Sequence, residues 1–160
     1  MVGHLIVGST GTGKTTYVKS LINKVDINNR LIYDVNNEYG VNIKLPNFQD
    51  FAERVTRIKN AFIVFEEATI FLNNRGSNQY IIDSLVRKRH TSNYYVLVFH
   101  SLRSVPKYIY DLCTHVTLFK TNDNYDLIDK RFKDDRLSKA FALLMKKDKE
   151  DYRHFTIKIY

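Results

Sequence analysis

The apolar residues of this chain gather in short runs that alternate with stretches of helical spacing. Apolar runs of strand length predict strands at residues 2–7, 30–35, 61–65, 94–99 and 114–119. Apolar positions three and four residues apart predict helices at residues 14–25, 48–58 and 78–91, a short helix near Pro106, and a helix at 137–145. Strands and helices in this order indicate a parallel sheet with crossover helices, which is an α/β fold.

The end of the chain has a different pattern. Phe155, Ile157 and Ile159 alternate with polar residues, which predicts an edge or half-exposed strand. We find no internal repeat and no low-complexity linker. The chain has 160 residues, 44% of them hydrophobic, which is enough for one core and too few for two ordinary domains. Residues 1–160 are therefore expected to form a single domain.

The longest apolar stretches, at residues 61–65 and 94–99, have only the length of a strand. We therefore expect no transmembrane helix and no signal peptide. The single cysteine, Cys113, cannot form an internal disulfide and lies in an amphipathic stretch. It is expected to be a core residue of a protein in a reducing compartment.

Residues 8–15 read Gly-Ser-Thr-Gly-Thr-Gly-Lys-Thr, which matches G-x-x-x-x-G-K-[ST] between an apolar run and a helical pattern. In this context the glycines let backbone N–H groups turn inward and cradle phosphate oxygens. Lys14 would meet the β- and γ-phosphates, and the Thr15 hydroxyl would bind Mg²⁺. The expected ligands are thus ATP and Mg²⁺. The predicted nucleotide-binding residues are Gly8, Ser9, Thr10, Gly11, Thr12, Gly13, Lys14, Thr15 and Thr16.

Two carboxylates, Glu66 and Glu67, follow the apolar strand at 61–65. This is the pattern of the Walker B element, which needs one carboxylate for the Mg²⁺ site and a second to orient or deprotonate the attacking water. Glu66 fits the metal role, although Asp is more usual there, and Glu67 fits the catalytic role. The alternative is a strand that merely ends in solvated acids.

Basic residues end the helix predicted at 78–91, and a histidine ends the strand that follows. Arg87, Lys88 and Arg89 would either offset the negative end of the helix or supply a cation to the γ-phosphate bound by a neighbouring subunit. His100 is expected beside the Glu66–Glu67 pair, because adjacent parallel strands end on the same edge of a sheet. There it could contact the γ-phosphate or the water, or it could simply cap the strand.

The net charge of +8 is uneven along the chain. Residues 1–80 hold 9 Lys and Arg against 7 Asp and Glu, whereas residues 81–160 hold 16 against 10. A polyanionic partner such as nucleic acid is one explanation, and a solvated basic surface is the other. Candidate DNA contacts are Arg75, in a loop at 73–76, together with Arg103 and Lys107.

Four segments, within roughly residues 2–120, resemble the FtsK/HerA group of DNA-translocating ATPases. They are similar, more narrowly, to the small viral genome-packaging ATPases and the zonular-occludens-toxin-like morphogenesis ATPases of filamentous phages. The segments are GSTGTGKTT at 8–16, YDVNNEY at 33–39, IVFEEA at 63–68, and RKRH at 87–90 leading into VLVFHS at 96–101. The resemblance implies a RecA-like, three-layer α/β/α P-loop NTPase fold with a mostly parallel sheet. It also implies an Mg²⁺-dependent ATPase that works as a homo-oligomeric ring and translocates nucleic acid.

The resemblance also implies roles for single residues. Arg89 becomes the favoured arginine finger that acts on the neighbouring subunit, with Arg87 as the other candidate. His100 takes the sensor position, where the group commonly has Gln, and Asp34 and Glu38 would lie near the nucleotide. Without the resemblance, Asp34 and Glu38 are equally consistent with a turn. Expected partners are viral DNA and a capsid or membrane portal protein, and the expected location is the host cell cytoplasm, the virion or its assembly site.

Two other functions are compatible with the sequence. Many small-molecule kinases are P-loop domains of this size, and the basic stretch from Lys130 to Lys139 could be a phosphate lid. The paired Glu66 and Glu67 suit water activation better than recognition of a kinase substrate. A protein that binds ATP without hydrolysing it is the third class, which the intact Lys14, Thr15 and Glu67 argue against.

Overall fold

A computed structural model describes residues 2–40, 48–72, 75–146, 148 and 151–159. Its strands are β1 (Val2–Val7), β2 (Arg30–Tyr33), β3 (Phe62–Phe65), β4 (Tyr94–Phe99), β5 (His115–Leu118) and β6 (Phe155–Lys158). Its α-helices are α1 (Lys14–Ile22), α2 (Phe48–Arg57), α3 (Ala68–Leu72), α4 (Arg75–Thr91), α5 (Lys107–Leu112), α6 (Tyr125–Phe132) and α7 (Asp135–Met145). Short 3₁₀ turns lie at Ile27–Asn29 (η1) and Leu102–Ser104 (η2).

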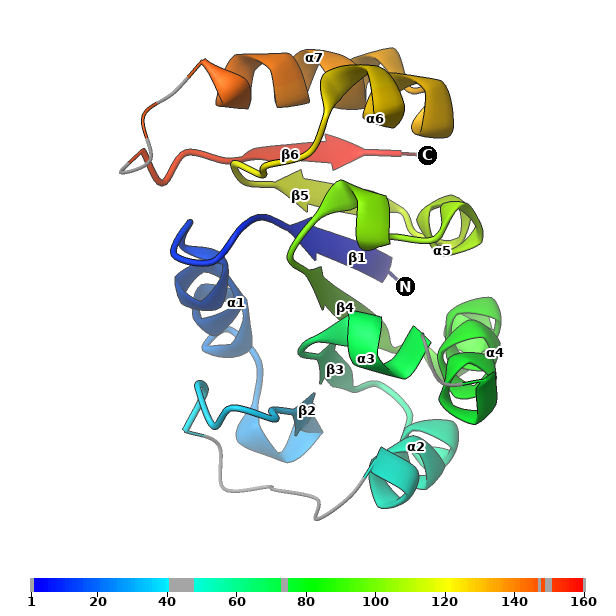
Figure 1. Ribbon diagram of the computed structural model, residues 1–160. Helices are drawn as coiled ribbons and strands as arrows, with labels where there is room; N and C mark the ends of the chain where they lie inside the picture. The colour runs from blue at the N-terminus through cyan, green and yellow to red at the C-terminus, as the bar shows by residue number, and fades with distance from the viewer. Residues whose placement is uncertain (1, 41–47, 73–74, 147, 149–150, 160) are drawn as a thin grey trace.

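The strands form one six-stranded sheet in the order β2-β3-β4-β1-β5-β6. The first five strands are parallel, and β6 pairs antiparallel with β5 at the edge, as the alternating tail predicts. Val7 pairs with Phe99, and Phe65 pairs with Leu97, so β1, β3 and β4 end at the same edge of the sheet. In Figure 1 the two chain termini lie at the same end of the sheet, where β1 begins.

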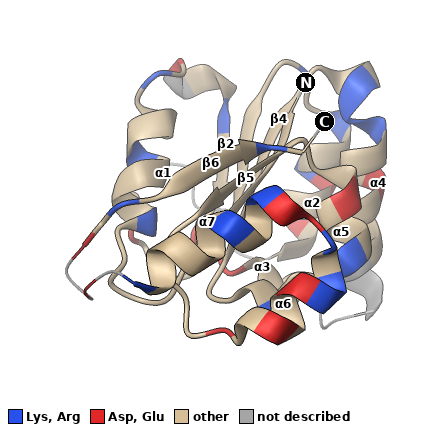
Figure 2. Cartoon of the chain, turned by 90° about the horizontal axis from the view of Figure 1, so that it is seen from above, with Lys and Arg blue, Asp and Glu red and all other residues tan. Residues whose placement is uncertain are grey.

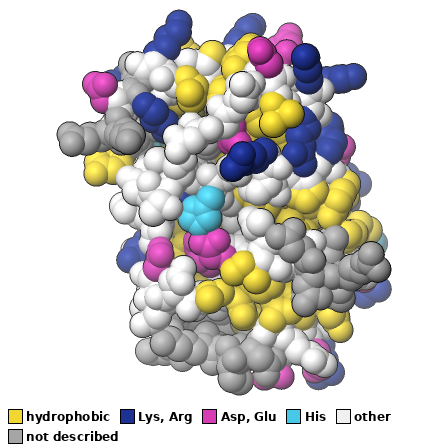
Figure 3. Space-filling view, in the orientation of Figure 1, with side chains coloured by type: hydrophobic (Ala, Val, Ile, Leu, Met, Phe, Trp, Pro, Cys, Tyr) yellow, Lys and Arg dark blue, Asp and Glu magenta, His cyan; other side chains and the backbone are white. Residues whose placement is uncertain are grey.

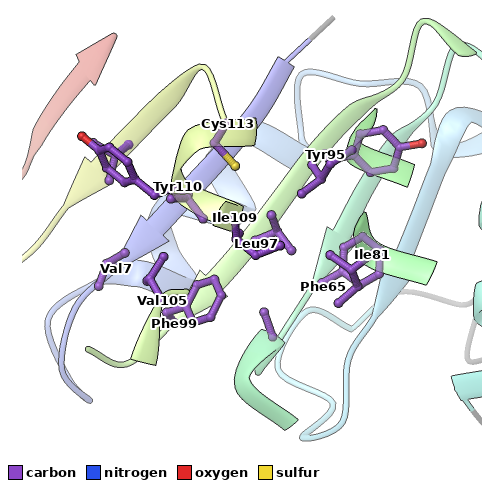
Figure 4. Close-up of a cluster of buried hydrophobic side chains, with 14 of the residues drawn as sticks. Val7, Phe65, Ile81, Tyr95, Leu97, Phe99, Val105, Ile109, Tyr110 and Cys113 are labelled. Atoms are coloured by element: carbon purple, nitrogen blue, oxygen red, sulfur yellow. The ribbon is translucent and has the colours of Figure 1, made fainter. Parts of the chain in front are cut away.

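Helices cover both faces of the sheet and complete the expected three-layer α/β/α sandwich (Figure 1). Val18 and Ile22 of α1 pack on one face, where Ile6 of β1 is fully buried. The other helices bury their apolar side chains on the opposite face, in a larger core. Figure 4 shows part of this core, in which Leu97 of β4 lies near Ile109 of α5 and near Cys113. Cys113 is fully buried, as its amphipathic surroundings predict.

Several elements differ from the sequence pattern. Strand β2 ends at Tyr33, not at residue 35, and helix α4 begins at Arg75, not at residue 78. The first helix ends at Ile22, not at residue 25, because Lys24 and Val25 donate to carbonyls three residues back and tighten the last turn. Val25 still packs against the core, which is why the apolar spacing continues past the end of the helix. Helices α3 and α6 were not predicted, since each has only two buried side chains and therefore a weak periodic signal.

Among the residues that the structure describes, no helix is both long enough and apolar enough to cross a membrane.

Candidate functional site

The loop at residues 8–15 joins the end of β1 to the start of α1 and is anchored to the neighbouring strands. The Gly8 amide donates to the Phe99 carbonyl at 3.1 Å, and the Ser9 amide donates to the Lys120 carbonyl at 2.9 Å. A Cβ on Gly8 would lie 2.5 Å from the Cβ of Phe119, so a larger residue does not fit. Gly13 caps α1 with φ +95°, a backbone conformation that favours glycine. These glycines therefore hold a loop whose helix N-terminus is free to bind an anion.

The Lys14 side chain reaches back across this loop. Its Nζ donates to the Ser9 carbonyl at 2.9 Å and lies 3.5 Å from Nδ1 of His100. Burial lowers the pKa of the Lys14 ammonium, and the charges of Glu66, Glu67 and Glu38 oppose that shift. The charges of three carboxylates thus act on the lysine that would meet a phosphate.

Glu66 is only 4% exposed, and its neighbours determine its protonation. Burial raises the pKa of Glu66, and the nearby charges of Glu38 and Glu67 raise it further. Tyr39 donates a hydrogen bond to Oε2 of Glu66, which lowers the pKa of Glu66, as the charge of Lys14 also does. A positive charge at this point would favour the ionised carboxylate.

The segment after β2 supplies both Tyr39 and Glu38. The Asp34 carboxylate accepts hydrogen bonds from the amides of Glu38 and Tyr39, each at 2.9 Å. The Thr15 hydroxyl donates to Oε2 of Glu38 at 2.7 Å. Asp34 therefore forms the turn that the residue types predict, and this turn brings Glu38 to the phosphate loop as the resemblance implies.

Glu67 and His100 meet at the carboxyl edge of the sheet. Oε1 of Glu67 contacts Nε2 of His100, which links the ends of β3 and β4. Glu67 has φ +55°, in the left-handed region that side chains other than glycine rarely adopt. From this turn the carboxylate of Glu67 reaches His100 at the end of the neighbouring strand. The arrangement agrees with the expectation that His100 lies beside the paired glutamates.

The basic residues of α4 lie far from the phosphate loop of the same chain. Arg87 and Arg89 are exposed near the end of α4, which leads into the start of β4. The six residues of β4 separate that end from His100 by about 20 Å. Arg89 lines a hollow of about 680 Å³ with Val86, Lys88 and other residues of α4 and α5. Neither arginine therefore joins Lys14 and Glu67 within one chain.

The three candidate DNA contacts have different surroundings. Arg75 is the first residue of α4 and not part of a loop, and its side chain lies outside the described residues. Lys107 is exposed on α5 and forms an ion pair with Asp111. Arg103 is exposed in η2 and lines a hollow of about 390 Å³ with Ser9 and other residues, so it lies beside the phosphate loop. Figure 3 shows basic side chains gathered on the upper half of this face of the molecule.

The stretch from Lys130 to Lys139, a lid in the kinase hypothesis, forms the end of α6 and the start of α7. Arg131 donates to the carbonyls of Arg103 and Val105 at 2.6 and 2.8 Å, and Arg136 donates to the carbonyl of Lys158 at 2.7 Å. Basic and acidic residues are interspersed on these helices in Figure 2. The stretch is therefore part of the packed fold, with its arginines bonded to neighbouring backbone.

Two residues beside the phosphate loop, Tyr152 and His154, were not predicted. They precede β6 and line a cavity of about 710 Å³ with Gly13, Phe119 and other residues, mostly from α1. Local spacing carries no signal for them, since Tyr152 is 139 positions from Gly13 along the chain. The alternating pattern of the tail predicts a strand that pairs with the sheet, and this is the signal that could have placed the residues just before it near the sheet.

The order of the strands and the contents of the loop together define the class of fold. A phosphate loop follows β1, paired glutamates follow β3, and β4 lies between these two strands and ends in a polar residue. Ligands of such open parallel sheets bind at the carboxyl ends of the strands. The chain has a P-loop NTPase fold.

Comparison with solved structures agrees with this assignment. The genome packaging NTPase B204 from Sulfolobus turreted icosahedral virus 2, in complex with ATPγS, superposes with a TM-score of 0.75 and 15% identity, over 99% of this chain and 92% of that chain. B204, the DNA-packaging ATPase from Sulfolobus turreted icosahedral virus, superposes with a TM-score of 0.67 and 12% identity, over 98% of this chain and 97% of that chain. No protein-family profile and no curated protein matches the chain. At these identities the likeness shows a shared fold, the one that the sequence motifs predict.

Proposed function

We propose that this protein is an ATPase that translocates nucleic acid during viral genome packaging, as a homo-oligomeric ring. The observation that carries the proposal is the convergence of Lys14, Glu67 and His100 at one edge of the sheet, beside a complete phosphate loop. A binding protein needs the loop alone, whereas a carboxylate turned toward the same place can act on water. The likeness to B204, a packaging NTPase studied with ATPγS and AMPPCP, supports the same conclusion.

The roles of the residues follow from their positions. Backbone amides of residues 8–16 and the Lys14 ammonium bind and orient the phosphates. Glu67 accepts a proton from the attacking water, and His100, in contact with it, holds its carboxylate in place and senses the γ-phosphate. Nδ1 of His100 lies 3.5 Å from Nζ of Lys14. Movement of the lysine onto a phosphate would therefore change the contact that His100 makes.

The residues present fit a magnesium ion. The Thr15 hydroxyl contacts Glu38, the charge of Glu38 acts on Glu66, and Mg²⁺ prefers oxygen ligands of these kinds. Burial and, to a smaller extent, the charges of Glu38 and Glu67 raise the pKa of Glu66, and a divalent cation would oppose both effects. Thr15 and Glu66 would hold the ion, with Glu38 next to Thr15. Bound there, Mg²⁺ would neutralise charge on the phosphates.

A ring is proposed because the resemblance assigns Arg89 of α4 to catalysis, yet Arg89 does not lie among the described residues near Lys14 and Glu67 of its own chain. Arg89 is exposed at the opposite edge of the sheet, where it can face a neighbouring copy. Basic residues of the same molecule, including Lys107, would contact nucleic acid through its phosphates. A capsid or membrane portal protein at the assembly site in the host cell would be the docking partner.

The alternative is a small-molecule kinase. Its candidate lid, the stretch from Lys130 to Lys139, has Arg131 and Arg136 bonded to backbone carbonyls of neighbouring segments. The paired Glu66 and Glu67 suit activation of water better than recognition of a kinase substrate. The observations therefore favour hydrolysis.

The deciding experiment is steady-state ATP turnover, measured with and without long DNA over a wide range of protein concentration. A ring motor predicts that specific activity rises with protein concentration and rises again with DNA. A kinase predicts activity that is independent of both and that appears only with an acceptor. Turnover that responds to neither variable would contradict the proposal.

A further inference from the structure

Two hollows flank the phosphate loop, and the chemistry of the site decides which end of a nucleotide each would receive. The hollow of about 390 Å³ is lined by Ser9, Thr10 and His100 among others, on the side of the catalytic pair. The cavity of about 710 Å³ lies on the other side, along the first turns of α1. Because Glu67 and His100 must face the γ-phosphate, the nucleoside end of the ligand points into the larger cavity.

Aromatic rings line that cavity. His154 lies between Tyr17 and Phe119, with ring centroids 4.7 Å and 4.8 Å away. These three rings form one wall, in which His154 is exposed, Tyr17 is half-buried and Phe119 is buried. The exposed ring of His154 in this wall can stack against a nucleobase.

Tyr152 adds a second, separate ring. Its Cδ1 lies 3.4 Å from the position of a Cβ on Gly13, so the ring lies directly over the start of α1. Tyr152 is 62% exposed, and among the residues that the structure describes no aromatic ring stacks on it. A large ring left uncovered at the mouth of a cavity is available to a ligand.

The tail is attached firmly enough to hold this ring in place. Phe155 pairs with Leu118 in the antiparallel β5–β6 ladder, and the hydroxyls of Thr117 and Thr156 are 2.8 Å apart. Just before β6, Arg153 forms an ion pair with Asp151. The pairing of β6 with β5 therefore places Tyr152, just before β6, against the phosphate loop.

We propose that Tyr152, together with the wall formed by Tyr17, Phe119 and His154, is the nucleobase-binding site of this protein. The inference rests on the proposed function and adds the part of the site that binds the base. Stacking does not distinguish one purine from another, and the hydroxyls of Thr16 and Ser20 at the cavity can donate or accept. The site therefore binds adenine and guanine nucleotides with similar affinity.

The test is the equilibrium binding of two probes, each measured in the presence of Mg²⁺. One probe is AMPPCP, and the other is inorganic tripolyphosphate, which has no base. Tyr152→Ala should weaken AMPPCP binding by about 5-fold to 150-fold and leave tripolyphosphate binding unchanged. Tyr152→Phe keeps the ring and should bind both probes like the natural protein. Tyr125→Ala, which removes a tyrosine that is 44% exposed on α6, is the matched control and should change neither. The guanine analogue of AMPPCP should bind the natural protein within a few fold of AMPPCP.

The outcomes separate this inference from the proposed function. AMPPCP binding that depends on Lys14 but not on Tyr152 would overturn the nucleobase site and leave the ATPase proposal intact. Equal weakening of both probes by Tyr152→Ala, in a variant with an unchanged circular dichroism spectrum, would also overturn it, because Tyr152 would then act on the loop. If the natural protein binds neither probe, both proposals fail.

Discussion

The hydroxyl of Tyr39 donates a hydrogen bond to Glu66, a buried carboxylate that follows a different strand. Burial alone would shift Glu66 toward its protonated form, and this hydrogen bond acts in the opposite direction by lowering its pKa. Asp34 in turn holds the amide of Tyr39 at 2.9 Å. The segment after β2 therefore adjusts the charge of the carboxylate after β3.

The first prediction follows from this relationship. Tyr39→Phe removes the hydrogen bond that lowers the pKa of Glu66, so the carboxyl group stays protonated up to a higher pH. The acid limb of the ATPase pH–rate profile should move to higher pH, while activity on the alkaline side stays close to that of the natural protein. Tyr80→Phe, at an exposed position on α4, is the control. An unchanged acid limb would show that Glu66 does not need to be ionised.

Glu67→Gln should bind ATP and hydrolyse it at least about 10²-fold more slowly, because the amide keeps the size of the side chain but cannot accept the proton. Single-turnover hydrolysis and AMPPCP binding, measured on the same preparation, separate the two effects. Ordinary turnover by this variant would transfer the role of base to Glu66 or Glu38.

The position of Arg89 predicts an effect between subunits. Arg89→Ala should keep its fold and ATP binding but lose about 10³-fold or more in hydrolysis, the effect of a missing transition-state cation. Mixed with Glu67→Gln, which is inactive for a different reason, it should regain activity, since one interface in the mixture contains both natural groups. Arg87→Ala, tested in the same way, identifies which of the two arginines acts.

A simple charge at the end of a helix would behave differently. In that case Arg89→Ala would lose at most about 1 kcal/mol of stability and would turn over ATP normally. Normal turnover by the variant alone, or no recovery in a mixture shown to co-assemble, would contradict the assignment between subunits.

DNA binding should depend steeply on salt and little on sequence, because exposed lysines and arginines contact phosphates. Lys107→Ala should weaken binding about equally for all sequences and reduce the salt slope by about 1. Lys19→Ala removes an exposed lysine from α1, on the other face of the sheet, and is the matched control. Filter binding or anisotropy over a salt series measures both, and affinity that ignores salt would contradict the prediction.

A fifth prediction concerns stability and a buried histidine of β1. His4 accepts or donates hydrogen bonds at 2.7 Å to both Tyr94 and Thr117. Burial, with a smaller contribution from the charge of His115, lowers its pKa from 6.5 to about 4. The folded protein therefore favours neutral His4, and the unfolded chain binds a proton first as the pH falls.

Stability from this residue is fully present above pH 6.5 and is lost as the pH falls toward 4, by about 3 kcal/mol in total. Urea unfolding of the natural protein at several pH values measures the loss. His4→Gln cannot titrate, so its stability should fall less over the same range even if it is lower throughout. Parallel curves for the two proteins would contradict the shift.

The sequence predicts most of the strands and the phosphate loop because these features are local. The loop is one strand–turn–helix unit, and the glutamates and His100 are each adjacent to a strand whose apolar run is plain. Contacts between distant segments carry no such pattern. Tyr39 meets Glu66 across 27 positions, and Tyr152 reaches Gly13 only because the last strand pairs with β5. Helix α6 escaped prediction because only Ile128 and Phe132 are buried in it.

The α4–β4 unit carries Arg89 near one edge of the sheet and His100 at the other, about 20 Å apart. Its strand lies between two parallel neighbours, β1 and β3, and pairs with both. In a ring, the two groups at its ends would face two different nucleotides. A unit that moves as one body would pass a displacement at one nucleotide on to the next. Neighbouring subunits would then hydrolyse ATP in sequence and not at random.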